Sequence, residues 1–249
     1  MKNLFRNSLI VSAFLGATAI STLASAQTPA PAPAPGASDH DSVVGHLGVG
    51  YLGRRGMLIG TLGNEVQAPV IGVRYWMDSQ MGIDAGLGFS STSGSTEVSG
   101  GGVSVKADSP SNTAFILHGG VPIVLSNGKH YSFQITPELN LGIGSGSSEQ
   151  VQGGVALKTD TSGFHLDLGA RAGGEVHFGF MGLPEVSLLA NVGLALAHDS
   201  VSTEGPQGVM NGVPGPTVKN SASQLGIGTT VGNSPWSIFT SSVAALYYF

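Results

Sequence analysis

The chain has 249 residues, of which 41% are hydrophobic, 10% are charged and 39 are glycine. Globular domains carry about 25% charged residues and about 7% glycine, so this chain has too little charge to cover an ordinary water-soluble domain. The net charge of −5 does not suit a nucleic-acid-binding protein, which needs a clustered basic surface, and the lack of cysteine excludes disulfides and thiol chemistry.

Residues 1–26 have the features of a secretory signal peptide. Lys2 and Arg6 precede an apolar stretch over 9–23, and three small residues then offer a cleavage site before Gln27. The alternating Ala and Pro residues that follow favour an extended periplasmic spacer over 27–42. We therefore expect ordered structure to begin near Val43 and the folded region to span 43–249.

Side chains alternate between apolar and polar with a period of two in several segments, which is typical of β-strands. The two clearest segments are 131–144 and 164–177. These are long for strands of a soluble sheet and fit tilted strands that cross a bilayer. Shorter alternating segments lie at 47–52, 71–76, 83–89, 115–118 and 186–196, and 238–249 completes a set of eight.

The polar positions of these segments hold mostly glycine with isolated charged residues. Such a face is a poor soluble surface but a reasonable interior for a narrow barrel, so the apolar face is expected to point outward, opposite to a lipocalin-like barrel. The sequence thus predicts an all-β fold, a closed antiparallel transmembrane β-barrel of eight strands. Ten strands are the alternative, with 96–106 and 224–231 supplying the additional crossings.

Short and long connections alternate along the chain, as in outer-membrane barrels. The short connections are 77–81, 126–129 and 179–184, and the long polar connections are 53–68, 91–111, 145–162 and 198–235. Two irregularities are expected. A bulge near 119–122 would reconcile the side-chain parity on either side of the 126–129 turn, and a second bulge would accommodate Pro137.

The end of the chain carries its most specific pattern. Phe249 is preceded at alternate positions by Tyr247, Ala245 and Val243. This ending resembles the C-terminal strand of Gram-negative outer-membrane β-barrels, and in general form 43–249 resembles the small OmpX/OmpW-type barrels. The resemblance implies that the barrel-assembly machinery reads these four residues as an assembly signal.

Charged residues on the polar positions of the predicted strands form a candidate polar network in the lumen: Arg74, Asp84, Glu138, Asp167, Arg171 and Glu175. A turn at 77–81 would place Arg74 opposite Asp84. Arg171 is four residues from both Asp167 and Glu175, about 13 Å along a strand, so each carboxylate meets a different neighbour. Glu138 is the nearest partner for Arg171. The expected role is structural ion pairing, with a polar gate as the alternative.

No cofactor or metal site is expected. The seven histidines form no H-x-H or H-x-x-x-H pattern, and His165 and His177 would lie about 40 Å apart along one strand. The G-x-G-x-x-G match at 48–53 is not followed by a helix pattern, which a dinucleotide site requires.

Two His-x-Ser sequences, 130–132 and 198–200, are similar in spacing to the His and Ser of the lipid A 3-O-deacylase family. The first lacks the Asn that follows the Ser in that family, and the second has Asp199 and Glu204 nearby as acidic partners. A lipid A-modifying hydrolase is therefore a minor alternative, and the prediction is a protein that is not an enzyme.

The function expected from these features is a non-enzymatic role in the envelope or at the cell surface, exerted through long extracellular loops of an integral outer-membrane protein. Passage of small or hydrophobic solutes, as in OmpW-like barrels, is the alternative. The expected partners are outer-membrane lipids and the barrel-assembly machinery, with no nucleic acid. The sequence names neither a solute nor a surface ligand.

Overall fold

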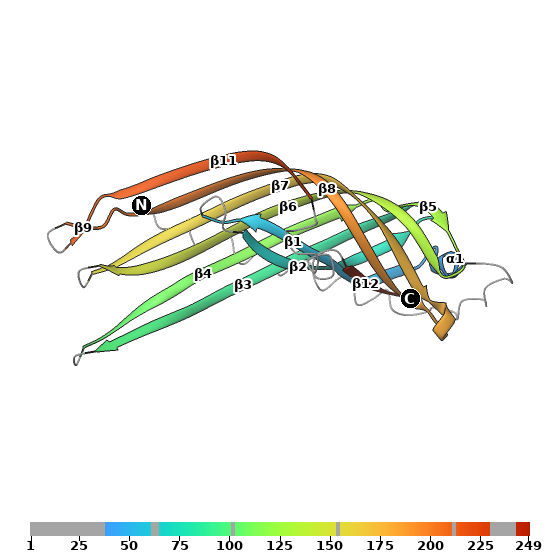
Figure 1. Ribbon diagram of the computed structural model, residues 1–249, viewed down its shortest axis with the longest axis horizontal. Helices are drawn as coiled ribbons and strands as arrows, with labels where there is room; N and C mark the ends of the chain where they lie inside the picture. The colour runs from blue at the N-terminus through green and yellow to red at the C-terminus, as the bar shows by residue number, and fades with distance from the viewer. Residues whose placement is uncertain (1–37, 61–64, 101–102, 153–154, 211–212, 230–242) are drawn as a thin grey trace, which may run out of the picture. The chain divides into compact units, whose positions relative to one another are not determined.

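The computed structural model describes residues 38–60, 65–100, 103–152, 155–210, 213–229 and 243–249. The chain divides into two units, Met1–Pro35 and Gly36–Phe249, and all described residues belong to the second. The predicted signal peptide and residues 27–37 of the predicted spacer lie outside the described residues. The elements are α1 (Asp39–Val43), β1 (Leu47–Leu58), β2 (Glu65–Trp76), β3 (Gly82–Gly100), β4 (Val103–Gly120), β5 (Ile123–Asn127), β6 (Tyr131–Gln152), β7 (Val155–Phe178), the 3-10 turn η1 (Gly179–Met181), β8 (Leu183–Pro206), β9 (Val209–Met210), β10 (Val213–Pro214), β11 (Thr217–Thr229) and β12 (Val243–Tyr248) (Figure 1).

Eight strands form a closed ring of antiparallel, hydrogen-bonded neighbours. The order around the ring is β1, β2, β3, β4, β6, β7, β8 and β12. The ring closes where β12 pairs with β1, from Gly48 opposite Tyr248 to Tyr51 opposite Ala245. The prediction of eight antiparallel strands that close on themselves is confirmed at this level.

Two further strands belong to the same sheet without widening the ring. β5 continues the position of β4 along β6, and β11 continues the position of β12 along β8. The described residues of the segment offered as an additional crossing, 96–100 and 103–106, instead pair with each other in the β3–β4 hairpin, where Glu97 lies opposite Lys106. The segment 224–231 lies largely in β11, whose Gln224 lies opposite Asp199 of β8.

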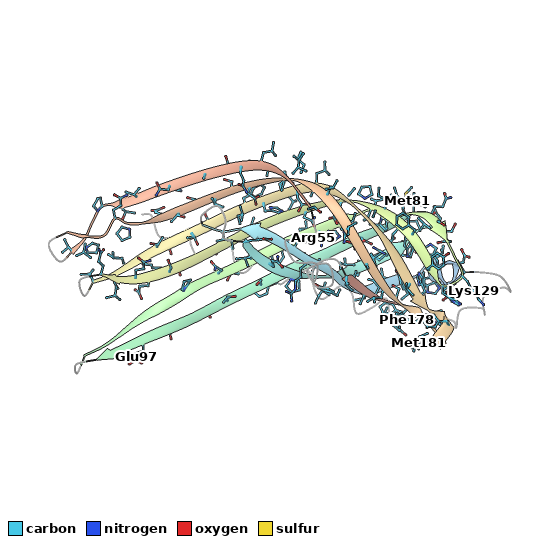
Figure 2. All side chains as sticks on the ribbon, viewed as in Figure 1. Arg55, Met81, Glu97, Lys129, Phe178 and Met181 are labelled. Atoms are coloured by element: carbon cyan, nitrogen blue, oxygen red, sulfur yellow. The ribbon has the colours of Figure 1, made fainter. Side chains whose placement is uncertain are left out.

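The predicted long connections are mostly continued strands. The β6–β7 ladder runs without a break to Gln152 opposite Val155, and the β3–β4 ladder runs to Gly100 opposite Val103. In Figure 2, Glu97 on β3 lies at the opposite end of these ladders from Met81, Lys129 and Phe178. The polar Ser, Thr and Gly residues there extend the sheet as hairpins because their backbone groups pair across the strands.

Burial alternates along the ring strands as the period-two pattern predicts. On β7, Leu168 is 63% exposed, whereas Asp167 and Arg171 are 8% and 4% exposed. Contacts between strands that are not neighbours, such as that between Arg74 on β2 and Glu175 on β7, show that the buried polar set points into the ring. The exposed large apolar side chains lie on the outer face.

The bulge predicted near 119–122 is wrong in position. The register between β5 and β6 shifts between Val124 and Ser126, which is closer to the 126–129 turn. This shift reconciles the side-chain parity on the two sides of the turn. No shift occurs at Pro137, where the β6–β7 register is continuous. Its carbonyl accepts a hydrogen bond from Val121, in the break between β4 and β5. In an antiparallel strand, the backbone nitrogen and the carbonyl of one residue face the same neighbouring strand. The N–H that Pro137 lacks would therefore point toward the break between β4 and β5.

Ordered structure begins before Val43, because the end of the predicted spacer forms the helix α1. Ser38 and Asp41 make a capping box: the Ser38 hydroxyl accepts from the Asp41 backbone, and the Asp41 carboxylate accepts from Ser38. A single helical turn has little stability alone, so contacts with the ring must hold it. Val43 supplies one, because it packs against the inward-facing Trp76 and Tyr248.

Gly50→Ala is expected to weaken ring closure, because a Cβ at this position would lie 1.9 Å from the carbonyl oxygen of Ala245 on β12. Overpacking of this kind costs about 1–3 kcal/mol, so the midpoint of thermal unfolding should fall. Gly119→Ala is the control, since nothing lies within 4 Å of its Cβ. Equal midpoints for the two variants would contradict the tight β1–β12 contact.

Candidate functional site: the polar interior of the strand ring

The interior of the ring is lined by polar side chains that are almost fully shielded from solvent. On the ring strands these are Arg55, Arg74, Asp84, His118, Ser132, Gln134, Thr136, Glu138, Asn140, His165, Asp167, Arg171, Glu175, His177, Ser187, Asn191 and Asp199. Buried charges are costly unless they are paired and hydrogen-bonded, so their partners determine what this interior can do.

Arg74 is the hub of a first group of contacts. Its Nε and Nη2 atoms donate to the two carboxylate oxygens of Asp84, both at 2.7 Å, and its Nη1 donates to Glu175 Oε2 at 2.9 Å. Arg74 lies directly opposite Asp84 in the β2–β3 register, as the predicted turn requires. One guanidinium thus compensates two carboxylates that come from opposite sides of the ring.

Glu175 accepts hydrogen bonds from four side chains. Besides Arg74, they are Ser187 Oγ at 2.5 Å, Tyr248 OH at 3.0 Å and Gln134 Nε2 at 3.1 Å. A carboxylate has about four lone-pair sites, so Glu175 is saturated. Tyr248 also accepts from Trp76 Nε1 at 3.2 Å, which ties β2 to β12 across β1.

Glu138 forms the centre of a second group, between two arginines. Arg171 Nε on the neighbouring strand lies 2.5 Å from Glu138 Oε2, and Arg55 Nη2 from β1 lies 3.0 Å from the same oxygen. The contact between Glu138 and Arg171 is the one expected from sequence, whereas the part played by Arg55 is not.

A third group is a chain of hydrogen bonds along the inner wall. His165 lies between two carboxylates, with Nε2 at 2.9 Å from Asp167 and Nδ1 at 2.7 Å from Asp199. Asn140 donates to Asp167 at 2.8 Å and contacts His118 at 2.6 Å. Four adjacent ring strands are therefore joined by side chains as well as by their backbones.

The six residues predicted for the polar network separate into three groups. Arg74, Asp84 and Glu175 meet in the first; Glu138 and Arg171 meet in the second; Asp167 belongs to the third. Arg171 contacts neither Asp167 nor Glu175 directly, in line with their spacing. The partners missing from the sequence prediction are Arg55, Gln134, Asn140, His165, Ser187, Asp199 and Tyr248. All of these partners except Arg55 lie at alternate, inward-facing positions of the predicted strands or of their direct continuation, where the sequence could have indicated them.

The first hairpin, β1–β2, bends across the inside of the ring instead of forming a polar connection. Its register shifts between Tyr51 and Arg54, where Gly53 has a φ of 99° that favours glycine. Beyond the shift, Met57 and Ile59 are buried against Ala114 and Ile116 of β4.

The hairpin is also hydrogen-bonded to the far wall of the ring. The Gly60 backbone N–H donates to the Ser162 carbonyl at 3.3 Å, and the Thr203 hydroxyl donates to the Gly60 carbonyl at 3.0 Å. The hairpin thus covers the interior from one side. At the other end, α1 inserts Val43 and His40, and both are buried.

The contacts at the two His-x-Ser sequences involve other partners than those a hydrolase would need. Ser132 Oγ is buried and has no hydrogen-bond partner in the described ranges, while His130 Nδ1 contacts Asp39 at 2.7 Å. Asp199 points to His165, on the neighbouring strand. No cluster of three or more His, Asp or Glu side chains that could hold a metal ion occurs among the residues that the structure describes.

The residues of the predicted assembly signal lie on the outer side of β12. Tyr247 and Phe249 are 51% and 45% exposed, whereas Leu246 and Tyr248 are buried. Within the described part of the chain, no helix is both long and apolar enough to cross a membrane. Comparison with models of known protein families and with curated proteins found no match.

Arg74→Met is expected to destabilise the protein by about 3–5 kcal/mol, because it leaves Asp84 and Glu175 buried without a cation. Adding Asp84→Asn and Glu175→Gln should restore part of this loss. Lys158→Met is the control, since Lys158 pairs with Asp160 at an exposed position worth at most about 1 kcal/mol. The free energy of unfolding of the purified variants measures all three effects, and equal losses for Arg74→Met and Lys158→Met would contradict the hub role.

Proposed function

We propose that the chain is an integral outer-membrane β-barrel with a closed interior that acts without enzymatic chemistry, through the hairpins extending beyond its apolar belt. One observation carries this proposal: paired charges fill the ring, while large apolar side chains cover its outside. A soluble barrel requires the opposite arrangement, since an apolar exterior of this extent would aggregate in water. A bilayer is the solvent that matches it.

The exposed apolar side chains form a band with aromatic residues at its edges, which supports the proposal. At the edge of the band from which the hairpins extend, four residues lie directly opposite one another on adjacent strands: Phe89, Phe115, Ile143 and Phe164. At the end nearer α1, the exposed aromatic side chains include Tyr75, Tyr131, Phe180, Tyr247 and Phe249.

The height of the band fits a bilayer. On β6 the exposed apolar side chains run from Tyr131 to Ile143, about 40 Å along the strand at about 3.3 Å per residue. A strand tilt of about 40° reduces this to about 30 Å across the membrane. The hydrocarbon core of a bilayer is about 30 Å thick.

The hairpins beyond the band are the surface through which such a protein would act on the cell exterior. Their residues are mainly Ser, Thr and Gly, for example over 90–95. Their backbones are paired in antiparallel ladders, and such preordered hairpins suit recognition of a surface ligand at low entropic cost. The predicted signal peptide and the C-terminal strand pattern supply the export and assembly steps that this location requires.

Leu168→Arg is expected to destabilise the protein in lipid vesicles by about 2–4 kcal/mol, because it places a charge in the middle of the outer apolar band. Ser95→Arg, at an exposed position on the β3 extension, should change stability little. Urea unfolding in vesicles measures both, and an equal small effect at the two positions would contradict a membrane-embedded band.

At neutral pH the purified protein is expected to produce no discrete current steps in a planar bilayer, because α1 and the first hairpin both occupy the ring interior. A known open porin, added to the same bilayer preparation, is the positive control. Discrete steps from the purified protein itself would instead support the alternative of solute passage.

A further inference from the structure

The helix α1 is held at the end of the ring by a small set of contacts. It packs against β6, β7 and β8. His40 Nε2 contacts the Ser79 carbonyl at 3.1 Å, and the Asp39 backbone N–H donates to the Lys129 carbonyl at 2.8 Å. Asp39 Oδ2 accepts from the Gly179 N–H at 3.0 Å and lies 2.7 Å from His130 Nδ1.

Two buried histidines, each with at least one ring nitrogen that makes no hydrogen bond to a described residue, meet where α1 enters the ring. His40 and His177 are 1% and 0% exposed, with ring centroids 5.9 Å apart. His40 Nδ1 and both ring nitrogens of His177 have no hydrogen-bond partner among the described residues. His40 also contacts Trp76 edge-on, at a centroid distance of 4.5 Å.

The nearby carboxylates are already engaged by other groups. Both oxygens of Asp84 accept from Arg74, and Glu175 accepts from four side chains. A proton on His40 would therefore create a buried cation with no unengaged carboxylate beside it. The titratable and charged groups on α1 and the elements around it are Asp39, Asp41, His46, Arg74, Asp78, Lys129, His130, Glu175, His177, Glu185 and Tyr248.

Two of these groups, His130 and Asp41, do not promote release of α1 in acid. Protonation of His130 would strengthen its contact with Asp39, but this pair is partly exposed, at 32% and 14%, so the gain is small. Hydrogen bonds from the Ser38 backbone and hydroxyl lower the pKa of Asp41, so the helix cap stays ionised while His40 is protonated.

We propose that α1 is an acid-released plug: protonation of His40, which is buried beside His177, expels the helix from the end of the ring while the ring itself stays closed. This device is independent of any solute passing through the ring. It adds a pH-controlled change at the α1 end to the closed interior described above.

The direction of the effect follows from linkage between proton binding and docking. Burial lowers the pKa of docked His40 below the ordinary histidine value, against the attraction of Glu175 and with help from His177. The released helix binds the proton more tightly, so acid favours release. Docking is at full strength above about pH 6.5, and below it the protonation of His40 lowers the docking constant by up to about tenfold per pH unit.

Fluorescence of Trp76 tests the proposal in the full exported protein in detergent micelles. The chain has two tryptophans, so a Trp236→Phe background isolates Trp76, which is 0% exposed under His40. Between about pH 8 and pH 4.5, we expect acrylamide quenching to rise several-fold with a red-shifted emission. The β-sheet circular dichroism signal should not change.

Histidine variants identify the groups responsible. His177→Gln is expected to move the transition to lower pH, because His177 helps to lower the pKa of docked His40. His40→Gln should remove the transition if its amide keeps the contact with Ser79. If His40→Gln is already released at pH 8, the His177→Gln profile decides. His198→Gln, on β8 away from α1, should reproduce the parent profile.

Three results would overturn the proposal. One is constant shielding of Trp76 down to pH 4.5 in the parent protein. Another is a transition that His177→Gln leaves unchanged. The last is a transition that coincides with loss of the β-sheet signal.

Discussion

Charge compensation inside a narrow ring is the constraint on which the rest of this structure depends. Arg74 joins Asp84 on the adjacent strand to Glu175 on a strand across the interior, so the pair geometry and the strand register fix each other. A one-residue slip of β2 would turn Arg74 to the outer face and leave both carboxylates buried alone. The ionic contacts therefore act less as a source of net stability than as a penalty on every alternative register.

Glycine is the second half of the same constraint, because the ring must hold a hairpin as well as its own side chains. A Cβ on Gly163 would lie 1.9 Å from the Leu58 carbonyl oxygen, and one on Gly144 would lie 2.5 Å from Ile59 Cδ1. The high glycine content inferred from sequence to mark a packed interior thus has a specific use: it lets the first hairpin approach the far wall. One apolar cluster lies under this hairpin, around Met57 and Ile116, and a second lies at the α1 end, around Val43 and Trp76.

The sequence predicted side-chain contacts correctly where a short turn or the adjacency of two strands determines the register. It did not predict contacts beyond a register shift, where the side chains that face inward change from one alternate set to the other. Arg74 and Asp84 follow from the 77–81 turn, and Glu138 with Arg171 from adjacency. Arg55 could not be placed, because the irregularity after Tyr51 reverses which side chains face inward, and alternation over 47–52 gives no warning of it. Contacts across the ring, such as Trp76 with Tyr248, depend on closure, which no local pattern encodes.

The two closures of the interior differ in how they are held. The first hairpin is continuous with the ring through its ladder to β2, is fixed by Arg55 to Glu138, and buries a cluster of apolar side chains. The helix α1 has five residues, contributes Val43 and His40 to the interior, and leaves ring nitrogens of His40 and His177 unsatisfied. A single turn cannot persist through its own hydrogen bonds. We therefore expect the α1 end to open at a lower free-energy cost than the end covered by the first hairpin.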